Sequence, residues 1–164
     1  MSMIGAKGDG ESWGLDHGAW SVLRALYPDA DVPVIQLSLN CQLSAADHYA
    51  LGRQLVSLRN DNVLILGSGN VVHNLRYFRS ATKPFDWAIR FNDAAKAKIA
   101  TRDHKALIAY DTLTPDARLS VPTSEHYLPL LYALAAQGAD EKVEVLTDDV
   151  LTSLSMTSVA IGLG

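Results

Sequence analysis

The stretch Val63-Leu-Ile-Leu-Gly-Ser-Gly-Asn70 joins an unbroken apolar run to a glycine-rich turn. A short apolar run that ends at such a turn is typical of a strand buried on both faces, the kind found in parallel sheets. Residues 33–39 predict a second, half-buried strand, because their side chains alternate with a period of two. Residues 142–146 and 158–163 are predicted to form two further strands.

Helices are predicted between these strands. Ser44 and Asp47 have the spacing of a capping box at the start of a helix that runs through 48–59. Further helices are predicted over 17–27, before Pro28, and over 84–100, 105–110 and 124–137, the last of them closed by Gly138. This alternation predicts an α/β fold: a layered domain in which helices flank a mostly parallel or mixed central sheet.

Length and composition bound the class of protein. The chain has 164 residues, of which 48% are hydrophobic, so it is long enough to bury the core of one domain. The formal net charge is −4, from 14 basic and 18 acidic residues, and we therefore expect neither nucleic acid nor an anionic membrane surface as a partner. No apolar stretch approaches the roughly 20 residues that a bilayer-spanning helix needs.

The first residues and the cysteine content predict the compartment. Residues 1–10 are expected to form a flexible leader, and they lack the apolar core of a secretory signal. The chain has one cysteine, Cys41, so it can form no intrachain disulfide and no zinc site of paired thiols. Together these features predict a cytoplasmic protein.

Three of the five histidines lie at boundaries between predicted elements: His17, His73 and His126. Neutral imidazole is the commonest metal ligand and titrates near neutral pH, so converging histidines can hold a metal and move protons. Taken singly, each is more often a helix cap, a loop hydrogen-bonding group or a satisfied core group. His48 and His104 have charged neighbours and are expected on solvated helix faces.

Other chemistries have weaker support. Gly67 and Gly69 follow a predicted strand, as in phosphate-binding loops, but Val72 occupies the third glycine position of the dinucleotide fingerprint. No Gly-x-Ser-x-Gly nucleophile motif is present. Nothing beside Cys41 would activate it as a nucleophile.

Four ordered motifs carry a resemblance to a known family. They are Trp13-Gly-Leu-Asp-His-Gly-Ala-Trp20, Tyr27-Pro-Asp-Ala-Asp-Val-Pro33 followed by Gln36-Leu-Ser38, Gly69-Asn-Val-Val-His-Asn-Leu-Arg76, and Glu125-His-Tyr-Leu-Pro-Leu-Leu-Tyr132. In this combination the chain resembles the class III extradiol ring-cleavage dioxygenases, in the branch of 4,5-DOPA extradiol dioxygenase-like proteins. Members of that family carry a further N-terminal segment with metal-binding histidines in Gly-His-Gly and Ala-His-Trp settings. Residues 11–164 therefore resemble the C-terminal portion of such a domain, and the resemblance implies the extradiol dioxygenase fold.

The resemblance implies a role for each of the three histidines. His126 matches a metal ligand, and His73 matches a histidine that faces the metal as an acid/base group or as an additional ligand. His17 matches a second acid/base histidine. The implied cofactor is Fe(II) or Zn(II), and the implied reaction opens a catechol-type ring, such as that of DOPA, with O2.

Neighbouring residues receive supporting roles on the same basis. Asp16 would orient the ring of His17, and Glu125 would be a further carboxylate ligand. Asn74 and Tyr127 would shape the pocket.

Two alternative functions stay open at this point: an inactive binding or scaffold module of the same fold, and a zinc-dependent hydrolase. The lack of the N-terminal segment also predicts an exposed sheet edge or face. We therefore expect a homo-oligomer, or association with the missing segment.

Overall fold

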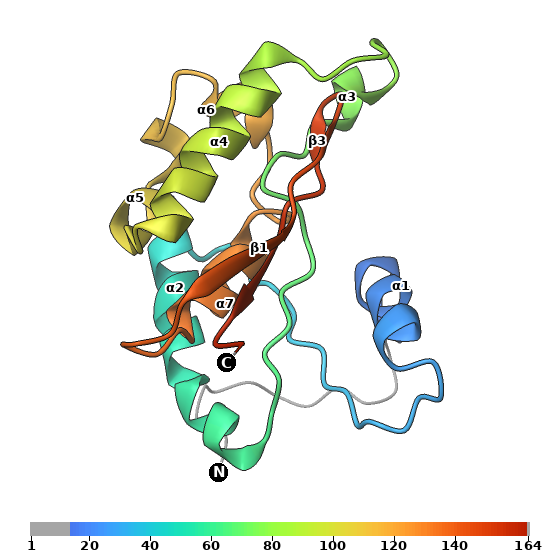
Figure 1. The fold of residues 1–164 in the computed structure, drawn as a ribbon, viewed down its shortest axis with the longest axis vertical. Coiled ribbons are helices and arrows are strands. Elements are labelled where there is room, and N and C mark those ends of the chain that lie inside the picture. The colour runs from blue at the N-terminus through green and yellow to red at the C-terminus, as the bar shows by residue number, and fades with distance from the viewer. Residues whose placement is uncertain (1–13, 164) are drawn as a thin grey trace. The chain divides into compact units, whose positions relative to one another are not determined.

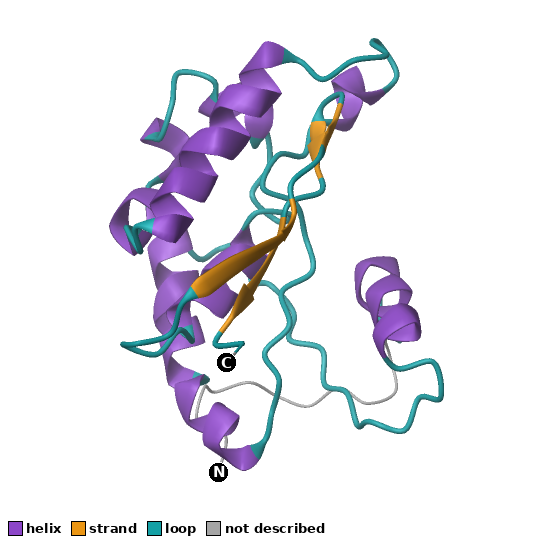
Figure 2. Cartoon of the chain, in the orientation of Figure 1, coloured by secondary structure: helices purple, strands orange, loops and turns teal. Residues whose placement is uncertain are grey.

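The computed structural model describes residues 14–163, which fall into two compact units, one within Met1–Asn40 and a larger one within Cys41–Gly164. Helices and loops predominate, and the strands are short (Figure 1, Figure 2). The helices are α1 (His17–Leu26), α2 (Ala45–Gln54), η1 (Val56–Asp61), α3 (Leu75–Phe78), α4 (Asp86–Ala100), α5 (His104–Ile108), η2 (Tyr110–Thr112), α6 (Ala117–Ser120) and α7 (Leu128–Ala135). The strands are β1 (Val143–Thr147), β2 (Val150–Leu151), β3 (Leu154–Ser155) and β4 (Ser158–Ile161).

In the first unit, helix α1 confirms the prediction for this segment. The carboxylate of Asp16 accepts a hydrogen bond of 2.8 Å from the main-chain N–H of Ala19, which caps the helix N-terminus. The helix ends at Leu26, before the backbone restriction that Pro28 imposes. Further along, the amide group of Gln36 exchanges hydrogen bonds of 3.0 and 3.1 Å with the main chain and the carboxylate of Asp16.

The strand predicted at 33–39 is wrong, because the structure has no regular element there. Ile35 in the middle of this segment is 95% exposed. A strand needs a neighbour to pair its backbone N–H and C=O groups, and none of the described strands pairs with this segment. A period of two reveals which side chains share a face, but it carries no information about whether a partner strand exists.

In the second unit, helix α2 begins at the predicted capping box and packs along α7 (Figure 1). The Ser44 hydroxyl accepts from the N–H of Asp47 at 3.2 Å, and the Asp47 carboxylate accepts from the N–H of Ser44 at 3.0 Å. The two helices approach closely at Gly52, where an added Cβ would lie 2.7 Å from the Cβ of Ala135. Only glycine permits this approach.

His48 lies one helical turn before Gly52 and faces the same neighbour. It is fully buried, and its Nδ1 lies 2.9 Å from the hydroxyl of Tyr132 on α7. The expectation of a solvated His48 is therefore wrong. The cause is the contact between α2 and α7, which places this residue at a helix–helix interface.

The region after α2 departs from the sequence prediction in two places. The helix expected to continue to Arg59 is broken at Gln54, and a 3₁₀ helix, η1, follows until Asn62 takes a left-handed φ of 59°. The predicted buried strand at 63–66 is an irregular segment instead, in which Leu64 is 64% exposed. Its apolar side chains have the composition of a buried strand, but none of the described strands pairs with them.

The core of this unit comes mainly from α4, α5 and α7. Helix α4 confirms the prediction for 84–100, with its N-cap at Phe85, and α5 confirms the short helix expected at 105–110. Helix α7 is shorter than predicted, since it begins at Leu128 after a turn that starts at Ser124. The largest buried apolar side chains are Phe91, Ile99, Leu107, Tyr127, Leu131 and Leu134.

The strands form two small antiparallel sheets rather than one. Strands β1 and β4, both predicted from the sequence, pair with each other, and Val143 lies opposite Ile161. Strands β2 and β3 form a hairpin. The fold of the described residues is thus a mixture of helices and strands. The layered central sheet of the prediction is not found among residues 14–163.

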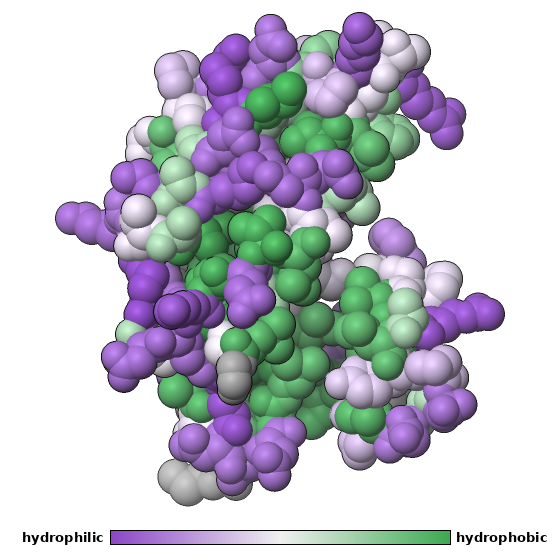
Figure 3. Space-filling view, in the orientation of Figure 1, coloured by the Kyte–Doolittle hydropathy of each residue, from purple (hydrophilic) through white to green (hydrophobic). Residues whose placement is uncertain are grey.

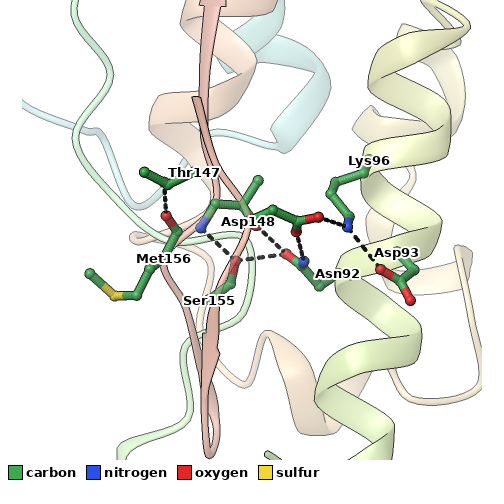
Figure 4. A network of polar contacts seen from close by, with 8 residues as sticks. Asn92, Asp93, Lys96, Thr147, Asp148, Ser155 and Met156 are labelled. Carbon is green, nitrogen blue, oxygen red and sulfur yellow. Dashed lines mark hydrogen bonds and ion pairs between the residues drawn. The ribbon is translucent and has the colours of Figure 1, made fainter. Parts of the chain in front are cut away.

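A polar network joins α4 to the C-terminal strands (Figure 4). Asn92 is buried, and its carbonyl oxygen accepts hydrogen bonds from the hydroxyls of Ser155 at 2.6 Å and Thr157 at 2.9 Å. Its amide donates to Asp148 at 3.3 Å, and Lys96 binds the same carboxylate at 2.5 Å. These bonds fix strand β3 against helix α4.

Within residues 14–163, none of the helices combines the length and the apolar composition needed to cross a membrane.

Candidate functional site

The imidazole rings of His73 and His126 stack on one another in the second unit. Their centroids are 3.5 Å apart and their planes differ by 15°. His73 follows the glycine-rich turn at 67–70, and His126 precedes helix α7, so two loops far apart in the sequence meet at this pair. The sequence singles out both residues, and the structure brings them together.

The backbone of the two loops is in direct contact beside the ring pair. The N–H of Asn70 donates to the carbonyl oxygen of His126 at 2.8 Å. A Cβ on Gly69 would overlap the same carbonyl oxygen. Gly69 therefore serves close backbone approach rather than phosphate binding, and the contact fixes the distance between the loops.

His73 is also held by the hairpin of β2 and β3. Its N–H donates to the carbonyl of Ser120 at 2.8 Å, and it forms an isolated antiparallel bridge with Leu154. On either side of His73, the N–H of Ser155 donates to Val72 at 2.9 Å and the N–H of Asn74 donates to Ser153 at 3.1 Å. The segment that carries the ring is thereby attached to the hairpin as a short extra strand.

The surroundings of the pair lower the pKa of His73, mainly through burial. Burial lowers the pKa of His73, the neighbouring His126 lowers it further, and the carboxylate of Glu125 opposes both effects. Burial alone would raise the pKa of Glu125. The hydrogen bond from Thr123 at 2.7 Å, a bond from its own backbone N–H and the two nearby imidazoles outweigh burial, so the pKa of Glu125 is lowered.

Asn74 and Tyr127, expected to shape the pocket, have side chains engaged elsewhere. Asn74 caps helix α3 and donates to the carbonyl of Leu119 at 2.7 Å. Tyr127 is fully buried, and its hydroxyl donates to the carbonyl of Leu107 at 3.0 Å. Both residues stabilise the loops that carry the histidines.

His17 lies in the first unit, as the first residue of α1, and its side chain is exposed. Asp16, expected to orient this ring, uses one carboxylate oxygen to cap the helix and the other to bind Gln36. The acid/base role of His17 stays a prediction.

The donor set suits a metal only in part. His73 and His126 offer two imidazoles, which are good ligands for both iron and zinc. Among residues 14–163, no group of three or more histidine, cysteine or carboxylate side chains is arranged to hold a metal ion. The pair therefore has the chemistry of a partial ligand set that needs at least one further donor.

The expectation that His104 lies on a solvated helix face is also wrong. Its Nδ1 lies 2.8 Å from the hydroxyl of Tyr49, and its Nε2 lies 3.0 Å from the amide oxygen of Gln137. Burial lowers the pKa of His104, and the bond to Gln137 only partly compensates. No local signal in the sequence reveals these partners, since both are distant along the chain.

Comparisons with known proteins identify the family and several relatives of this chain. Residues 2–164 match the family described as the catalytic LigB subunit of aromatic ring-opening dioxygenase. A protein of Escherichia coli (strain K12) named 4,5-DOPA dioxygenase extradiol is 42% identical over 160 residues, which cover 94% of this chain and 59% of that protein. The protein of the same name from Beta vulgaris is 36% identical over 138 residues, which cover 81% of this chain and 50% of that protein.

One solved structure has a closely similar fold. The crystal structure of an uncharacterized protein from Escherichia coli K12 matches with a TM-score of 0.84 at 42% identity, over 92% of this chain and 64% of that chain. The chain thus spans less than two thirds of the length of each of these proteins.

Proposed function

Since the chain belongs to the family of catalytic LigB subunits of aromatic ring-opening dioxygenases, we propose that it takes part in the extradiol cleavage of a catechol-type ring by O2. The observation that carries this proposal is the stacked pair of His73 and His126, which two distant loops hold in the second unit. The names of the similar proteins support a DOPA-like substrate. We place the activity in the cytoplasm, where an exposed free thiol such as Cys41 stays reduced.

In this proposal His126 and His73 are two of the residues that would hold a non-heme Fe(II) or Zn(II). When bound, the ion supplies Lewis acidity and, as iron, the redox chemistry that ring cleavage by O2 requires. Because the described residues offer two imidazoles and no third grouped donor, the remaining ligands come from polypeptide outside residues 14–163. The carboxylate of Glu125 is close enough to act on the pKa of His73, but it is not grouped with the two imidazoles as a third ligand.

The histidines also move protons. One imidazole takes a proton from a catechol hydroxyl, and another returns a proton as the ring opens beside the two hydroxyls. His73 is proposed for one of these roles, and the family resemblance alone assigns the other role to His17. For His73, a ligand role and an acid/base role predict different outcomes, and measurements of metal affinity and turnover separate them.

The first test is metal binding by the chain as it exists. Iron(II) under anaerobic conditions, and separately zinc, are titrated into the unsubstituted chain, His126→Ala, His73→Ala and His104→Ala. We expect His126→Ala to weaken binding by about tenfold or more, because a ligand is lost. His104→Ala is the matched control, since it removes an imidazole elsewhere in the same unit. Equal affinity in the unsubstituted chain and His126→Ala would contradict the proposed site.

The second test is turnover. The chain is assayed alone and joined to the portion of the Escherichia coli relative that lies outside the match, with iron(II), DOPA and O2, for a coloured ring-opened product. Loss of general acid/base help lowers the rate by about 10²–10⁴-fold. His17→Ala is expected to lose rate and keep metal affinity. If His73→Ala also loses turnover rate but keeps metal affinity, His73 acts as a proton carrier. If the variant loses both turnover rate and metal affinity, His73 is a metal ligand. Absence of product from the joined protein would overturn the proposal.

We also propose that further polypeptide completes a layered central sheet and covers an apolar surface of the second unit. In the second unit, the segment 63–66 and strand β1 both expose apolar side chains, such as Leu64 and Leu146 at 64% and 58% exposure, and Figure 3 shows apolar side chains gathered on the face that carries β1. Exposed apolar patches and unpaired extended segments mark interaction surfaces. We assign this surface to the polypeptide that corresponds to the uncovered part of the relatives, whose strands would pair with 63–66.

Sedimentation tests this assignment. The chain alone is expected to self-associate, and the version joined to the uncovered part of the relative is expected to sediment as a smaller, discrete species with added strand content by circular dichroism. A monomeric chain whose strand content does not change on joining would contradict the assignment.

A further inference from the structure

A pocket in the larger unit shares no lining residue with the histidine pair. It has a volume of about 500 Å³ and is lined by Arg53, Arg102, His104, Tyr49, Gln137 and Val56, with the backbone that follows α7. This pocket, here called the arginine pocket, belongs to no step of the proposed ring cleavage. We propose that it binds the carboxylate or phosphate group of a small organic anion.

Both guanidinium groups of the arginine pocket are held by main-chain carbonyls, and most of their donors are not used by these bonds. Arg53 donates one N–H to the carbonyl of Ala135 at 2.8 Å, and Arg102 donates to the carbonyls of Gly138, at 2.5 Å, and Ala139. A guanidinium has five N–H donors in a rigid fork. Among residues 14–163, these bonds use one donor of Arg53 and two of Arg102, so an oxyanion meets preorganised donors.

Both charged side chains that line the arginine pocket are cationic, and its described lining residues include no carboxylate. Two carboxylates near these arginines bind other cations: Asp103 binds Lys98 at 2.8 Å, and Glu141 binds Arg59 at 2.5 Å. The charge of Arg102 also helps to lower the pKa of Glu141. A lining with two guanidinium groups and no carboxylate favours an anionic ligand.

Arg102 follows helix α4 and has a left-handed φ of 57°. Its N–H donates to the carbonyl of Ile99 at 3.0 Å, and the N–H of Asp103 donates to the carbonyl of Lys98 at 2.9 Å, which together form a Schellman cap. The cap fixes the backbone of a residue that lines the arginine pocket.

The other residues that line the arginine pocket would orient an organic ligand. His104 has both ring nitrogens engaged, with Tyr49 and Gln137, so its ring is held in a fixed orientation. The ring of Tyr49 and the side chain of Val56 provide apolar surface beside the charged groups. The volume lies in the range of about 300–1,000 Å³ that is usual for small-molecule sites.

The test is calorimetric titration of the chain at low salt with inorganic phosphate in one arm and malonate in the other, without metal or catechol. Saturable binding is expected, and the tighter probe identifies the preferred oxyanion. Arg53→Gln and Arg102→Asn are each expected to weaken binding by about tenfold or more, since each removes a charge-assisted contact. Asparagine is chosen at position 102 because it tolerates the left-handed backbone.

Arg118→Gln is the matched control, since it removes an exposed arginine of α6 outside the pocket. It should leave the affinity unchanged. Thermal unfolding of each variant checks the fold, and Arg53→Lys, which keeps the charge without the fork, should bind several-fold more weakly than the unsubstituted chain. Absence of saturable binding of both probes, or equal loss in Arg118→Gln, would overturn the proposal. Metal titration plays no part in this result, so the outcome is independent of the ring-cleavage proposal.

Discussion

The main-chain N–H of Asn70 donates to the carbonyl oxygen of His126 across 2.8 Å, and this contact joins the two loops that carry the stacked imidazoles. The bond involves backbone only, so it does not depend on the identity of either side chain. It requires a close approach of the two loops, which Gly69 permits because it has no side chain. The spacing of the imidazole pair therefore rests on the backbone of the glycine-rich turn.

Replacing Gly69 tests this dependence. In Gly69→Ala the new methyl group overlaps the carbonyl of His126, so the loops must separate. We expect a loss of about 1–3 kcal/mol in the free energy of unfolding, the range for overpacked sites, together with weaker metal binding. Urea unfolding and metal titration measure the two effects. Gly14→Ala is the control, because a Cβ at Gly14 meets nothing within 4 Å; equal stability of both variants would contradict the prediction.

Removing the amide of Asn92 should loosen the hairpin that holds His73. In Asn92→Ala the buried hydroxyl of Ser155 keeps the bond that it accepts from the N–H of Thr157 but loses the acceptor for its own proton, and a buried donor left unpaired costs about 1–3 kcal/mol. Chemical denaturation measures this loss. Asp93→Asn is the comparison, since Asp93 makes only an exposed ion pair with Lys96, worth about 0–1 kcal/mol. The prediction fails if the two substitutions cost the same.

The ion pair of Glu141 and Arg59 predicts a pH-dependent contribution to stability. The hydrogen bonds from Arg59 and from the N–H of Gly138 lower the pKa of Glu141 from 4.5 to about 2. The unfolded chain therefore takes up this proton first as the pH falls, so the stabilisation is present above about pH 4.5 and is lost as the pH decreases toward about 2. Glu141→Gln should cost about 1–2 kcal/mol near neutral pH and progressively less in acid.

Urea unfolding of this variant and of the unsubstituted chain at several pH values between about 7 and 3 gives the comparison. Glu144→Gln, which changes an exposed glutamate of β1, should show no such trend. A difference between Glu141→Gln and the unsubstituted chain that stays constant with pH would disprove the assignment.

Tyr127, next to His126, is predicted to act on stability and not on chemistry. Tyr127→Phe removes the hydrogen bond to the carbonyl of Leu107 and should cost about 1 kcal/mol in unfolding free energy. Metal affinity should be unchanged, because the hydroxyl points into the core. Denaturation and metal titration of the same preparation test both statements; a large loss of metal affinity at unchanged stability would place Tyr127 in the site instead.

Local signals in the sequence predict the existence of the longer helices, whereas the short helices η1, α3, η2 and α6 are not predicted. The capping box of Ser44 and Asp47, and the prolines at 28 and 84, act within a few residues, so their effect can be read without knowing the fold. The strands predicted at 142–146 and 158–163 are confirmed, and they form because each supplies the partner that the other needs. The segments 33–39 and 63–66 have strand composition but no partner among the described strands, and composition alone cannot supply one.

The site was predicted in part for the same reason. His73 and His126 were named from their settings and the family resemblance, and the structure places their rings together. His48 and His104 were misplaced because their partners, Tyr132 and Gln137, lie far along the chain. For His48 one signal was available: Gly52, four residues later, lies on the same helix face and marks a close helix contact.

The attachment of His73 to the hairpin means that the orientation of one imidazole is governed from outside the pair. Leu154 bridges to His73, and the tip of the hairpin contains Thr152 in a left-handed conformation with φ of 52°. A change in the length or register of that hairpin would shift the backbone that carries the ring of His73 without altering either histidine. Exchanging this surface turn would therefore offer a way to move one imidazole relative to the other from a distance.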